Sequence, residues 1–210
     1  SSTFLRKKQF KIVRIGIVGT GRIAPRFISE SKYVSGLTIE CAYNPVEESA
    51  KRFEKREKIK CYTGDYEEFL ENVDAVYIAS PNETHFEYAK KAIEAGKHVL
   101  SEKPLSFTKK ESEVLYTSAK EKGVVLMEAV KAAYCPGFQQ LINVAKSGKI
   151  GDIVDVEASF TRLADPLSRE RTDAEYGGAF LEFGPSVLVP VIKLMGKDYT
   201  SATFDSIYDG

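Results

Sequence analysis

The chain has 210 residues, and its 30 basic and 30 acidic side chains cancel to a formal net charge of zero. It therefore has no overall electrostatic field to attract a nucleic acid or an anionic membrane, and we exclude both as the main partner. With 43% hydrophobic residues and 8 prolines, the composition indicates a globular protein. No apolar run is as long as a membrane span, and the N-terminal SSTFLRKKQFK lacks the apolar centre of a secretion signal, so a cytoplasmic location is expected.

Cysteine and histidine are too few and too scattered to predict a metal centre. Cys41, Cys61 and Cys135 are widely spaced and stand among apolar neighbours, which predicts buried free thiols rather than a disulfide framework. His85 and His98 are the two histidines of the chain. A histidine-rich metal site is therefore not expected.

The stretch KIVRIGIVGTGRIA, residues 11–24, predicts a buried strand followed by a nucleotide-binding turn. Gly19, Gly21 and Ala24 stand at the Gly-x-Gly-x-x-Gly/Ala spacing. The first glycine permits a tight turn, the second lets a pyrophosphate approach the backbone, and the third small residue permits close packing of helix on strand. The helix that opens near Arg22 would point its N–H groups at the phosphates. Any turn can use glycine, so the rest of the sequence has to distinguish a nucleotide-binding turn from an ordinary one.

Strands and helices alternate through the first 127 residues. Strands are expected at 12–18, 37–43, 59–62, 75–79, 99–100 and 124–127. Helices are expected at 23–31, 46–58, 66–71 and 84–95, and a fifth helix is expected to follow Thr108 and to end at about residue 122. Asn82 is a candidate cap for the fourth helix, and Thr108 with Glu111 is a candidate capping box for the fifth. The alternation predicts an α/β fold with a doubly wound parallel sheet in residues 1–127.

The pattern changes from Glu128 onward. A helix is expected at 138–147, a half-exposed strand at 152–162, an apolar helix at 186–195 and a further strand at 200–207. These elements are too few for an independent core of ordinary size. Residues 128–210 are therefore expected to form part of an incomplete second domain, with Gly210 as a point of truncation.

Four motifs in this order resemble the Gfo/Idh/MocA family of oxidoreductases. They are Gly19-Thr20-Gly21-Arg22-Ile23-Ala24, Ser80-Pro81-Asn82 with His85, Glu102-Lys103-Pro104, and Glu128-Ala129. The resemblance covers about residues 13–195 and is stronger in the N-terminal half. It implies a Rossmann domain followed by an α+β domain whose mostly antiparallel, open-faced sheet forms a dimer interface, so a homo-oligomer is expected for the full-length protein.

The activity that the resemblance implies is reversible hydride transfer between NAD or NADP and a carbinol or carbonyl carbon of a sugar, polyol or similar small molecule. As hydride leaves the carbinol, its hydroxyl proton must pass to a nearby group, and in reduction the growing alkoxide needs a positive donor. Lys103 is the candidate acid/base because it follows a buried strand at its carboxyl end, where open α/β sheets bind ligands. Pro104 fixes the turn, through a cis bond often seen at this family position. The alternative is a solvated surface lysine.

A larger set of residues is implied to bind the cofactor. It comprises Gly19, Gly21, Arg22, Ile23, Ala24, Tyr43, Ser80, Pro81, Asn82, His85, Glu102 and Lys103. A plain strand-to-helix turn also explains the Ser80-Pro81-Asn82 segment, and packing in the first helical turn also explains His85. Glu102 is expected to orient the cofactor end of the site, and His98 to be structural.

Two positions depart from the family pattern. Where NAD-dependent relatives carry a carboxylate at the end of the second strand, this chain reads Cys41-Ala42-Tyr43-Asn44. NADP is slightly favoured, because Arg22 can approach a 2′-phosphate. Family enzymes generally have Asp at the position of Glu182, and His or Tyr at that of Ser186. Glu182 can still hold a substrate hydroxyl, but serine is no titrating proton donor.

Three functions therefore stay open. The leading hypothesis is an NAD(P)-dependent oxidoreductase in which Lys103 is the main acid/base and Glu182 positions the substrate. The second is a non-catalytic dinucleotide-binding sensor or regulatory protein, which Ser186 motivates. The third is a structural domain with an unused glycine turn.

Overall fold

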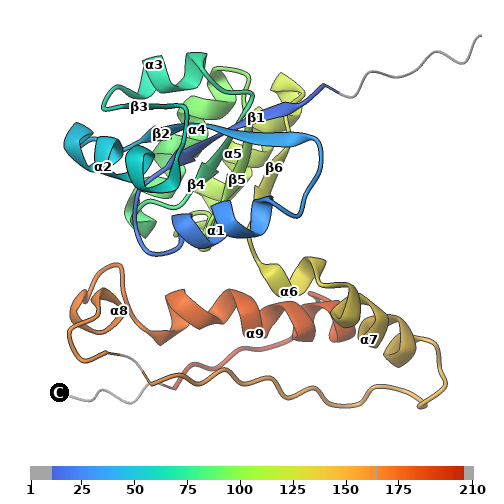
Figure 1. The fold of residues 1–210 in the computed structure, drawn as a ribbon. Helices are drawn as coiled ribbons and strands as arrows, with labels where there is room; N and C mark the ends of the chain where they lie inside the picture. The colour runs from blue at the N-terminus through green and yellow to red at the C-terminus, as the bar shows by residue number, and fades with distance from the viewer. Residues whose placement is uncertain (1–10, 164, 206–210) are drawn as a thin grey trace, which may run out of the picture. The chain divides into compact units, whose positions relative to one another are not determined.

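The computed structural model describes residues 11–163 and 165–205, and the chain divides after Ala129 into two compact units (Figure 1). The expected domain boundary, after residue 127, lies close to this division. Among the described residues, none of the helices has both the length and the apolar character that crossing a membrane requires.

A six-stranded parallel sheet forms the centre of the first unit. Its strands are β1 (Val13–Val18), β2 (Leu37–Tyr43), β3 (Cys61–Thr63), β4 (Ala75–Ile78), β5 (His98–Ser101) and β6 (Leu126–Glu128). Their order across the sheet is β3-β2-β1-β4-β5-β6, and every neighbouring pair is parallel. From β1 the chain adds β2 and β3 on one side of the sheet, and it then adds β4, β5 and β6 on the other side. The switch lies between the parallel neighbours β1 and β4, as in nucleotide-binding doubly wound folds. The predicted α/β fold is confirmed.

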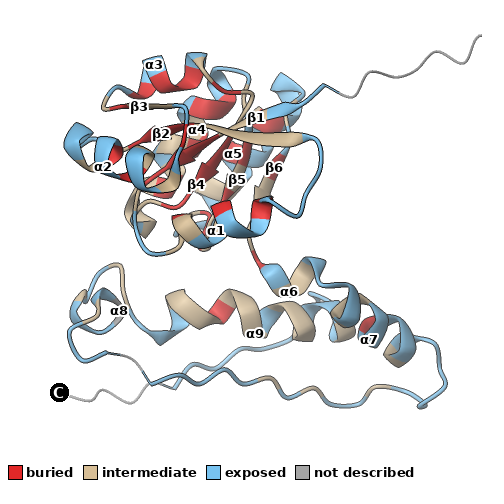
Figure 2. Cartoon of the chain, in the orientation of Figure 1, coloured by how far each residue is buried: buried red, intermediate tan, exposed pale blue. Residues whose placement is uncertain are grey.

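Helices cover both faces of this sheet. They are α1 (Ala24–Ser31), α2 (Glu47–Glu57), α3 (Tyr66–Glu71), α4 (His85–Glu94) and α5 (Lys109–Lys122). Side chains of α1 and α2, among them Ile28 and Phe53, pack on the face that carries Ile17 and Tyr77. Helices α3, α4 and α5 pack on the other face. Figure 2 shows the result, a buried sheet between helices that are exposed on their outer sides.

The beginnings of two helices test the expected caps. The Thr108 hydroxyl accepts a hydrogen bond from the Glu111 N–H at 3.2 Å, and the Glu111 carboxylate accepts from the Thr108 N–H at 3.1 Å, so the capping box is confirmed. The expectation for Asn82 is wrong. Asn82 begins a 3-10 turn, Asn82–Thr84, and α4 starts only at His85 with Thr84 in the N-cap position. The N–H of His85, the first residue of α4, is bound by the main-chain carbonyl of Asn82.

The cysteines also differ from the prediction. Cys41 of β2 lies opposite Cys61 of β3 in the parallel register, and the two form a disulfide. Cys135 is a free thiol, but it is exposed rather than buried. The pairing was not evident from the sequence, because the β2–α2–β3 crossover brings together two residues that are 20 positions apart.

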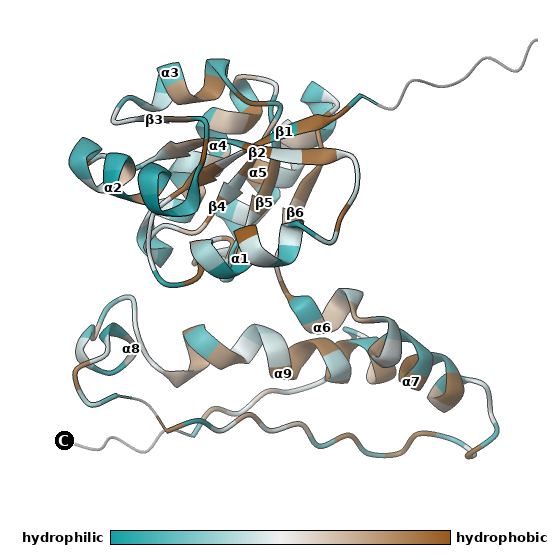
Figure 3. Ribbon diagram, viewed as in Figure 1, coloured by the Kyte–Doolittle hydropathy of each residue, from teal (hydrophilic) through white to brown (hydrophobic). Residues whose placement is uncertain are grey.

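The second unit is built around α9 (Ala179–Met195), which α6 (Lys131–Tyr134), α7 (Pro136–Lys146) and α8 (Arg169–Thr172) contact. Much of α9 is hydrophobic (Figure 3), and it begins seven residues before the expected helix at 186–195. Proline usually ends or kinks a helix, yet α9 contains both Pro185 and Pro190.

The strands expected at 152–162 and 200–207 are not formed in the described residues, and positions 206 and 207 lie outside them. A strand needs a hydrogen-bonded partner, and neither segment has one in the described part of the chain. Instead, Phe160 stacks on Phe183 of α9 with ring centroids 4.7 Å apart, and Phe204 meets Phe180 edge-on at 5.9 Å.

Asp74 joins the beginning of β4 to β1 through charged hydrogen bonds. Its carboxylate accepts from Nε and Nη2 of Arg14 at 3.2 and 3.0 Å, and from the Arg14 main-chain N–H at 3.1 Å. Lys11 Nζ lies farther away, at 3.4 Å, and its side chain is 83% exposed. The hydrogen bonds from Arg14 hold the pKa of Asp74 well below its ordinary value.

We expect Asp74→Asn to lower the free energy of unfolding by about 1–2 kcal/mol near neutral pH, since it removes a charge-assisted, bidentate pairing. Because folding depresses the Asp74 pKa, its stabilisation is complete above the unfolded pKa of about 4 and is lost as the pH falls towards the folded value. Urea unfolding from pH 7 to pH 3 should therefore show a shallower loss of stability in the variant. Lys11→Ala is the control and should change little; equal pH profiles for wild type and Asp74→Asn would contradict the account.

Candidate functional site

The turn after β1 lies at the carboxyl edge of the sheet. Gly19 has φ of +91°, and a Cβ there would lie 2.8 Å from the Ala79 oxygen and from main-chain atoms of Ser80, so the position requires glycine. Gly21 differs, because a Cβ there would meet nothing within 4 Å. Ala24 is completely buried. The backbone at Gly21 is thus accessible to a ligand, whereas Gly19 and Ala24 are fixed by packing.

Helix α1 begins at this turn without a side-chain cap. Its N-cap residue is Ile23, and its first turn contains no acidic side chain. The helix N-terminus therefore presents N–H groups and the positive end of the helix dipole at the turn. Arg22 is exposed beside it. This donor set fits the phosphates of a dinucleotide, which makes the turn suitable for the predicted cofactor.

Tyr43, the last residue of β2, turns its side chain into the core. It is 6% exposed, and its ring packs against Tyr66, Phe69 and Tyr88. Its hydroxyl lies 3.3 Å from that of Tyr88. Burial raises the pKa of the Tyr43 hydroxyl, which therefore stays protonated. Tyr43 reaches the glycine turn through its main chain, since its carbonyl accepts from the Gly19 N–H at 2.9 Å.

Asn44 supplies the polar side chain at the end of β2. Its Nδ2 donates to the Thr20 hydroxyl in the glycine turn at 2.8 Å, and its Oδ1 accepts from the Val46 N–H at 2.9 Å. Sequence reasoning missed Asn44 as a site residue. The available signal was the placement of an Asn two residues before a helix, where its carbonyl commonly accepts a main-chain N–H.

The turn after β4 is held by two side chains that follow it. The Thr84 hydroxyl lies 2.7 Å both from the Ser80 hydroxyl and from the Pro81 carbonyl oxygen. His85 is buried, at 1% exposure, and its Nε2 lies 2.9 Å from the Ser80 carbonyl oxygen. The predicted Ser80-Pro81-Asn82 segment is therefore an ordered loop next to Gly19.

Glu102 and Lys103 follow β5 at the same edge of the sheet. The Glu102 N–H donates to the Ile78 carbonyl at 2.8 Å, and the Glu102 carboxylate accepts from the Tyr77 hydroxyl at 2.7 Å. Tyr77 is buried and stacks on Phe27 of α1, with ring centroids 3.8 Å apart. Burial, and then the charge of Glu102, raises the pKa of Tyr77, so its hydroxyl remains a donor to the carboxylate.

The Lys103–Pro104 peptide bond is cis, as expected, and Lys103 is half-buried. The main chain is held on the far side of this bond, where the Leu105 N–H donates to Glu128 Oε1 at 2.9 Å. His85 Nδ1 lies 2.7 Å from the Pro104 carbonyl oxygen. Sequence reasoning used Glu128 only as a family marker, and the structure shows what its side chain contacts.

Glu182 and Ser186 lie on α9 of the second unit. They are four residues apart and both half-buried, so they share one face of the helix. The structure therefore gathers the predicted site residues of the first unit at the carboxyl edge of its sheet and places the other two on one helix of the second unit.

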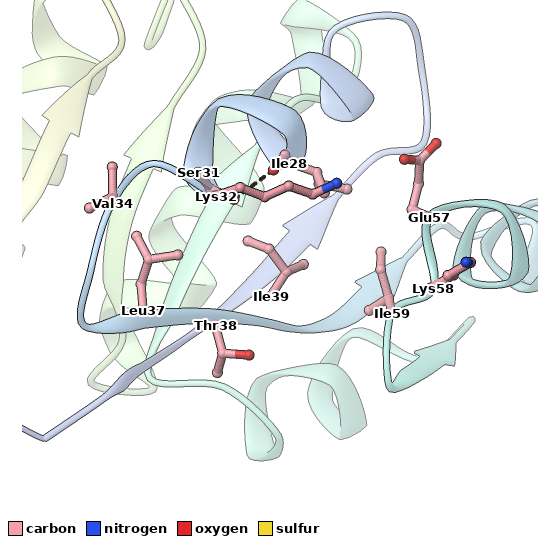
Figure 4. Close-up of a pocket in the computed structure, with 10 residues that line it drawn as sticks. All are labelled: Ile28, Ser31, Lys32, Val34, Leu37, Thr38, Ile39, Glu57, Lys58 and Ile59. Atoms are coloured by element: carbon pink, nitrogen blue, oxygen red, sulfur yellow. Dashed lines mark hydrogen bonds between the residues drawn. The ribbon is translucent and has the colours of Figure 1, made fainter.

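A cavity of about 280 Å³ lies elsewhere in the first unit, beside the start of β2 (Figure 4). It is lined by Ile28, Ser31, Lys32, Val34, Leu37, Thr38, Ile39, Glu57, Lys58 and Ile59. It contains none of the predicted site residues, and the Ser31 hydroxyl in it already donates to the Ile28 carbonyl. No group of three or more potential metal ligands occurs in the described residues.

The first unit matches a known family over most of its length. Residues 13–130 fit the Gfo/Idh/MocA family model, described as an oxidoreductase family with an NAD-binding Rossmann fold. Over 195 residues the chain is 31% identical to the scyllo-inositol 2-dehydrogenase (NADP(+)) of Bacillus subtilis, covering 88% of this chain and 59% of that protein. It is 34% identical over 177 residues to a dTDP-3,4-didehydro-2,6-dideoxy-α-D-glucose 3-reductase of Actinomadura kijaniata, and this match covers 82% of this chain and 53% of that protein.

A solved structure supports the same likeness. It is the KijD10 3-ketoreductase of Actinomadura kijaniata in complex with NADP and TDP-benzene, with a TM-score of 0.79 and 31% identity. The match covers 88% of this chain and 57% of that one. The chain thus spans between about half and three-fifths of the length of the proteins it resembles.

The two glycines of the turn should differ in their tolerance of a methyl group. We expect Gly19→Ala to lower the free energy of unfolding by about 2 kcal/mol or more, because it adds a positive-φ penalty and a collision with main-chain atoms. Gly21→Ala should change stability by no more than about 0.5 kcal/mol. Urea unfolding measures both. Equal stability of the two variants would argue against this geometry of the turn.

Proposed function

The chain belongs to the Gfo/Idh/MocA family of oxidoreductases, and on this premise we propose that it binds NADP or NAD along the carboxyl edge of its sheet. The whole protein would transfer hydride reversibly between the nicotinamide and a carbinol or carbonyl carbon of a sugar or polyol. The observation that carries the proposal is the joining of three loops at one edge: the glycine turn, the Ser80 loop and the Lys103 loop. Dinucleotides bind at this edge in doubly wound folds.

The glycine turn is suited to hold the pyrophosphate. Gly21 has space for it, and the N-terminus of α1 offers N–H donors and a favourable dipole. The Ser80 loop and Glu102 would line the nicotinamide half, since both follow strands on the other side of the switch in strand order. The hydrogen bond that the Tyr77 hydroxyl donates to the Glu102 carboxylate supports this role, because it holds the carboxylate in place.

Lys103 is proposed as the main acid/base. When bound, the nicotinamide supplies the hydride acceptor or donor. Lys103 would take the proton of the substrate hydroxyl during oxidation and return it to the alkoxide during reduction, which its positive charge also stabilises. Glu182 would hold a neighbouring substrate hydroxyl. Ser186 on the same face can donate or accept a hydrogen bond, but it cannot replace Lys103 as a titrating group.

NADP is proposed as the slightly preferred cofactor. The end of β2 carries the neutral Asn44 instead of a carboxylate, so a 2′-phosphate would meet no negative side chain there. Arg22, exposed at the adjacent turn, is proposed to contact that phosphate. A cytoplasmic location and a homo-oligomeric full-length protein complete the proposal; gel filtration with light scattering tests the latter.

We expect Lys103→Met to reduce kcat by about 10² to 10⁴, the usual contribution of a positioned acid/base, while changing the NADPH dissociation constant by less than about threefold. The assay follows nicotinamide absorbance in the full-length protein with sugars, polyols and dicarbonyls, starting with scyllo-inositol and NADP⁺. Lys91→Met, an exposed lysine of α4, is the matched control.

Two results would count against the proposal in different ways. If the wild type binds NADPH but turns over none of these compounds, the non-catalytic sensor replaces the enzyme. If mixing with NADPH or NADH changes neither the fluorescence of the protein nor that of the cofactor, no cofactor binds. The glycine turn then has only a structural role.

Asn44→Asp should shift the preference towards NADH by about tenfold or more, because a carboxylate repels a 2′-phosphate and accepts from ribose hydroxyls. The fold should tolerate it, since the Thr20 hydroxyl and the Val46 N–H can both donate to a carboxylate. The ratio of NADPH to NADH dissociation constants is the measurement. Asn72→Asp adds the same charge at the end of α3 as a control, and an unchanged ratio in Asn44→Asp would contradict the placement.

A further inference from the structure

His85 occupies an unusual position between two loops of the candidate site. Its imidazole is 1% exposed, so it has no access to solvent. Its Nε2 lies 2.9 Å from the Ser80 carbonyl oxygen, and its Nδ1 lies 2.7 Å from the Pro104 carbonyl oxygen. Ser80 follows β4 and Pro104 follows β5, and one side chain therefore spans the ends of two neighbouring strands.

Both partners of the ring are carbonyl oxygens, which can only accept hydrogen bonds. Doubly protonated imidazole donates to both, whereas the neutral ring donates to one and turns a lone pair towards the other. In either form the polar atoms of His85 are directed at the main chain and not at a ligand. A direct contact of this imidazole with cofactor or substrate therefore does not follow from its place in the motif.

The Pro104 carbonyl is a sensitive point for such a contact. It follows the cis Lys103–Pro104 bond, and the next main-chain N–H, that of Leu105, is bound by Glu128 at 2.9 Å. The loop that carries Lys103 is thus held at both polar groups of the Pro104–Leu105 peptide. On its other side, the Glu102 N–H is bound by the Ile78 carbonyl at 2.8 Å. A shift of the Pro104 carbonyl would change the direction of Lys103.

We propose that His85 is a positioning residue that couples the nicotinamide-lining Ser80 loop to the Lys103 loop. Through Nε2 it fixes the loop that lines the cofactor, and through Nδ1 it fixes the loop that aims the acid/base. The assignment of these two tasks rests on the proposed function; the physical coupling rests on the two nitrogen–oxygen distances and on the doubly protonated ring, the form that donates to both carbonyls. The two nitrogens therefore have separable effects, one on cofactor affinity and one on proton transfer.

Two amide substitutions separate the nitrogens. An Asn side chain places its amide nitrogen near the position of Nδ1, and a Gln side chain places it near that of Nε2. His85→Asn should keep the bond to Pro104, His85→Gln should keep the bond to Ser80, and His85→Phe keeps neither. His98→Asn and His98→Gln are the matched controls, since His98 is exposed at the start of β5, at the opposite edge of the sheet.

Relative to wild type, His85→Gln should lower kcat by about tenfold with an NADPH dissociation constant within about threefold, because loss of one buried hydrogen bond has this order of effect. His85→Asn should show the reverse, a weakened NADPH affinity with kcat retained at saturating cofactor. His85→Phe should lose both. The assay is that of the full-length protein with NADP⁺ and the polyol it turns over.

A readout without turnover keeps the coupling separate from the proposed function. After reductive methylation with ¹³C-formaldehyde, the Lys103 methyl signal, assigned with Lys103→Arg, reports the surroundings of its nitrogen. Its chemical shift should move in His85→Gln and His85→Phe and stay in His85→Asn. That pattern in a protein that turns over no substrate would overturn the proposed function and support the coupling.

The coupling itself is overturned by two results. One is that the Asn, Gln and Phe variants lose kcat and NADPH affinity to the same extent and in proportion to their fall in Tm, as a purely structural histidine would. The other is that the Lys103 methyl signal is unchanged in all three variants.

Discussion

The close approach of Gly19 to the main chain of Ser80 is the constraint on which the rest of the site depends. It brings the end of β1 against the end of β4, the two strands at which the order of the sheet reverses. A side chain at this position would push the two loops apart. From Ser80 the contacts continue through His85 to Pro104, and from Leu105 to Glu128 at the end of β6. The carboxyl edge is therefore connected from β1 to β6 by contacts that the His85 and Glu128 side chains make with the main chain of the loops.

Much of this unit was predictable because its causes are local. The order of strands and helices follows from short apolar runs that end in glycine, proline or asparagine, and right-handed crossovers then leave few arrangements of the sheet. The Thr108–Glu111 capping box involves residues three apart, so its spacing is visible in the chain. Lys103 was identified by its place after a buried strand and by its neighbours in the family motif. In the structure it lies at the carboxyl edge of the sheet.

The remaining features depend on contacts between residues far apart in sequence. The roles of Asn44 and Glu128 are visible only when the loops meet, since their partners Thr20 and Leu105 are 24 and 23 positions away. The Cys41–Cys61 pair arises from strand register, which spacing does not reveal. In the second unit, alternation in residues 152–162 indicated a strand, but a strand also needs a partner, and the described chain instead gives Phe160 a ring of α9 to stack on.

The central claim is that a dinucleotide lies along this connected edge with its reactive ring beside Lys103. The most direct measurement is a crystal structure of the full-length protein with NADPH. The account predicts the pyrophosphate over Gly21 at the N-terminus of α1 and the nicotinamide between the Ser80 loop and the Lys103 side chain. NADPH bound away from the glycine turn, or a Lys103 ammonium group directed away from the nicotinamide into solvent, would contradict it.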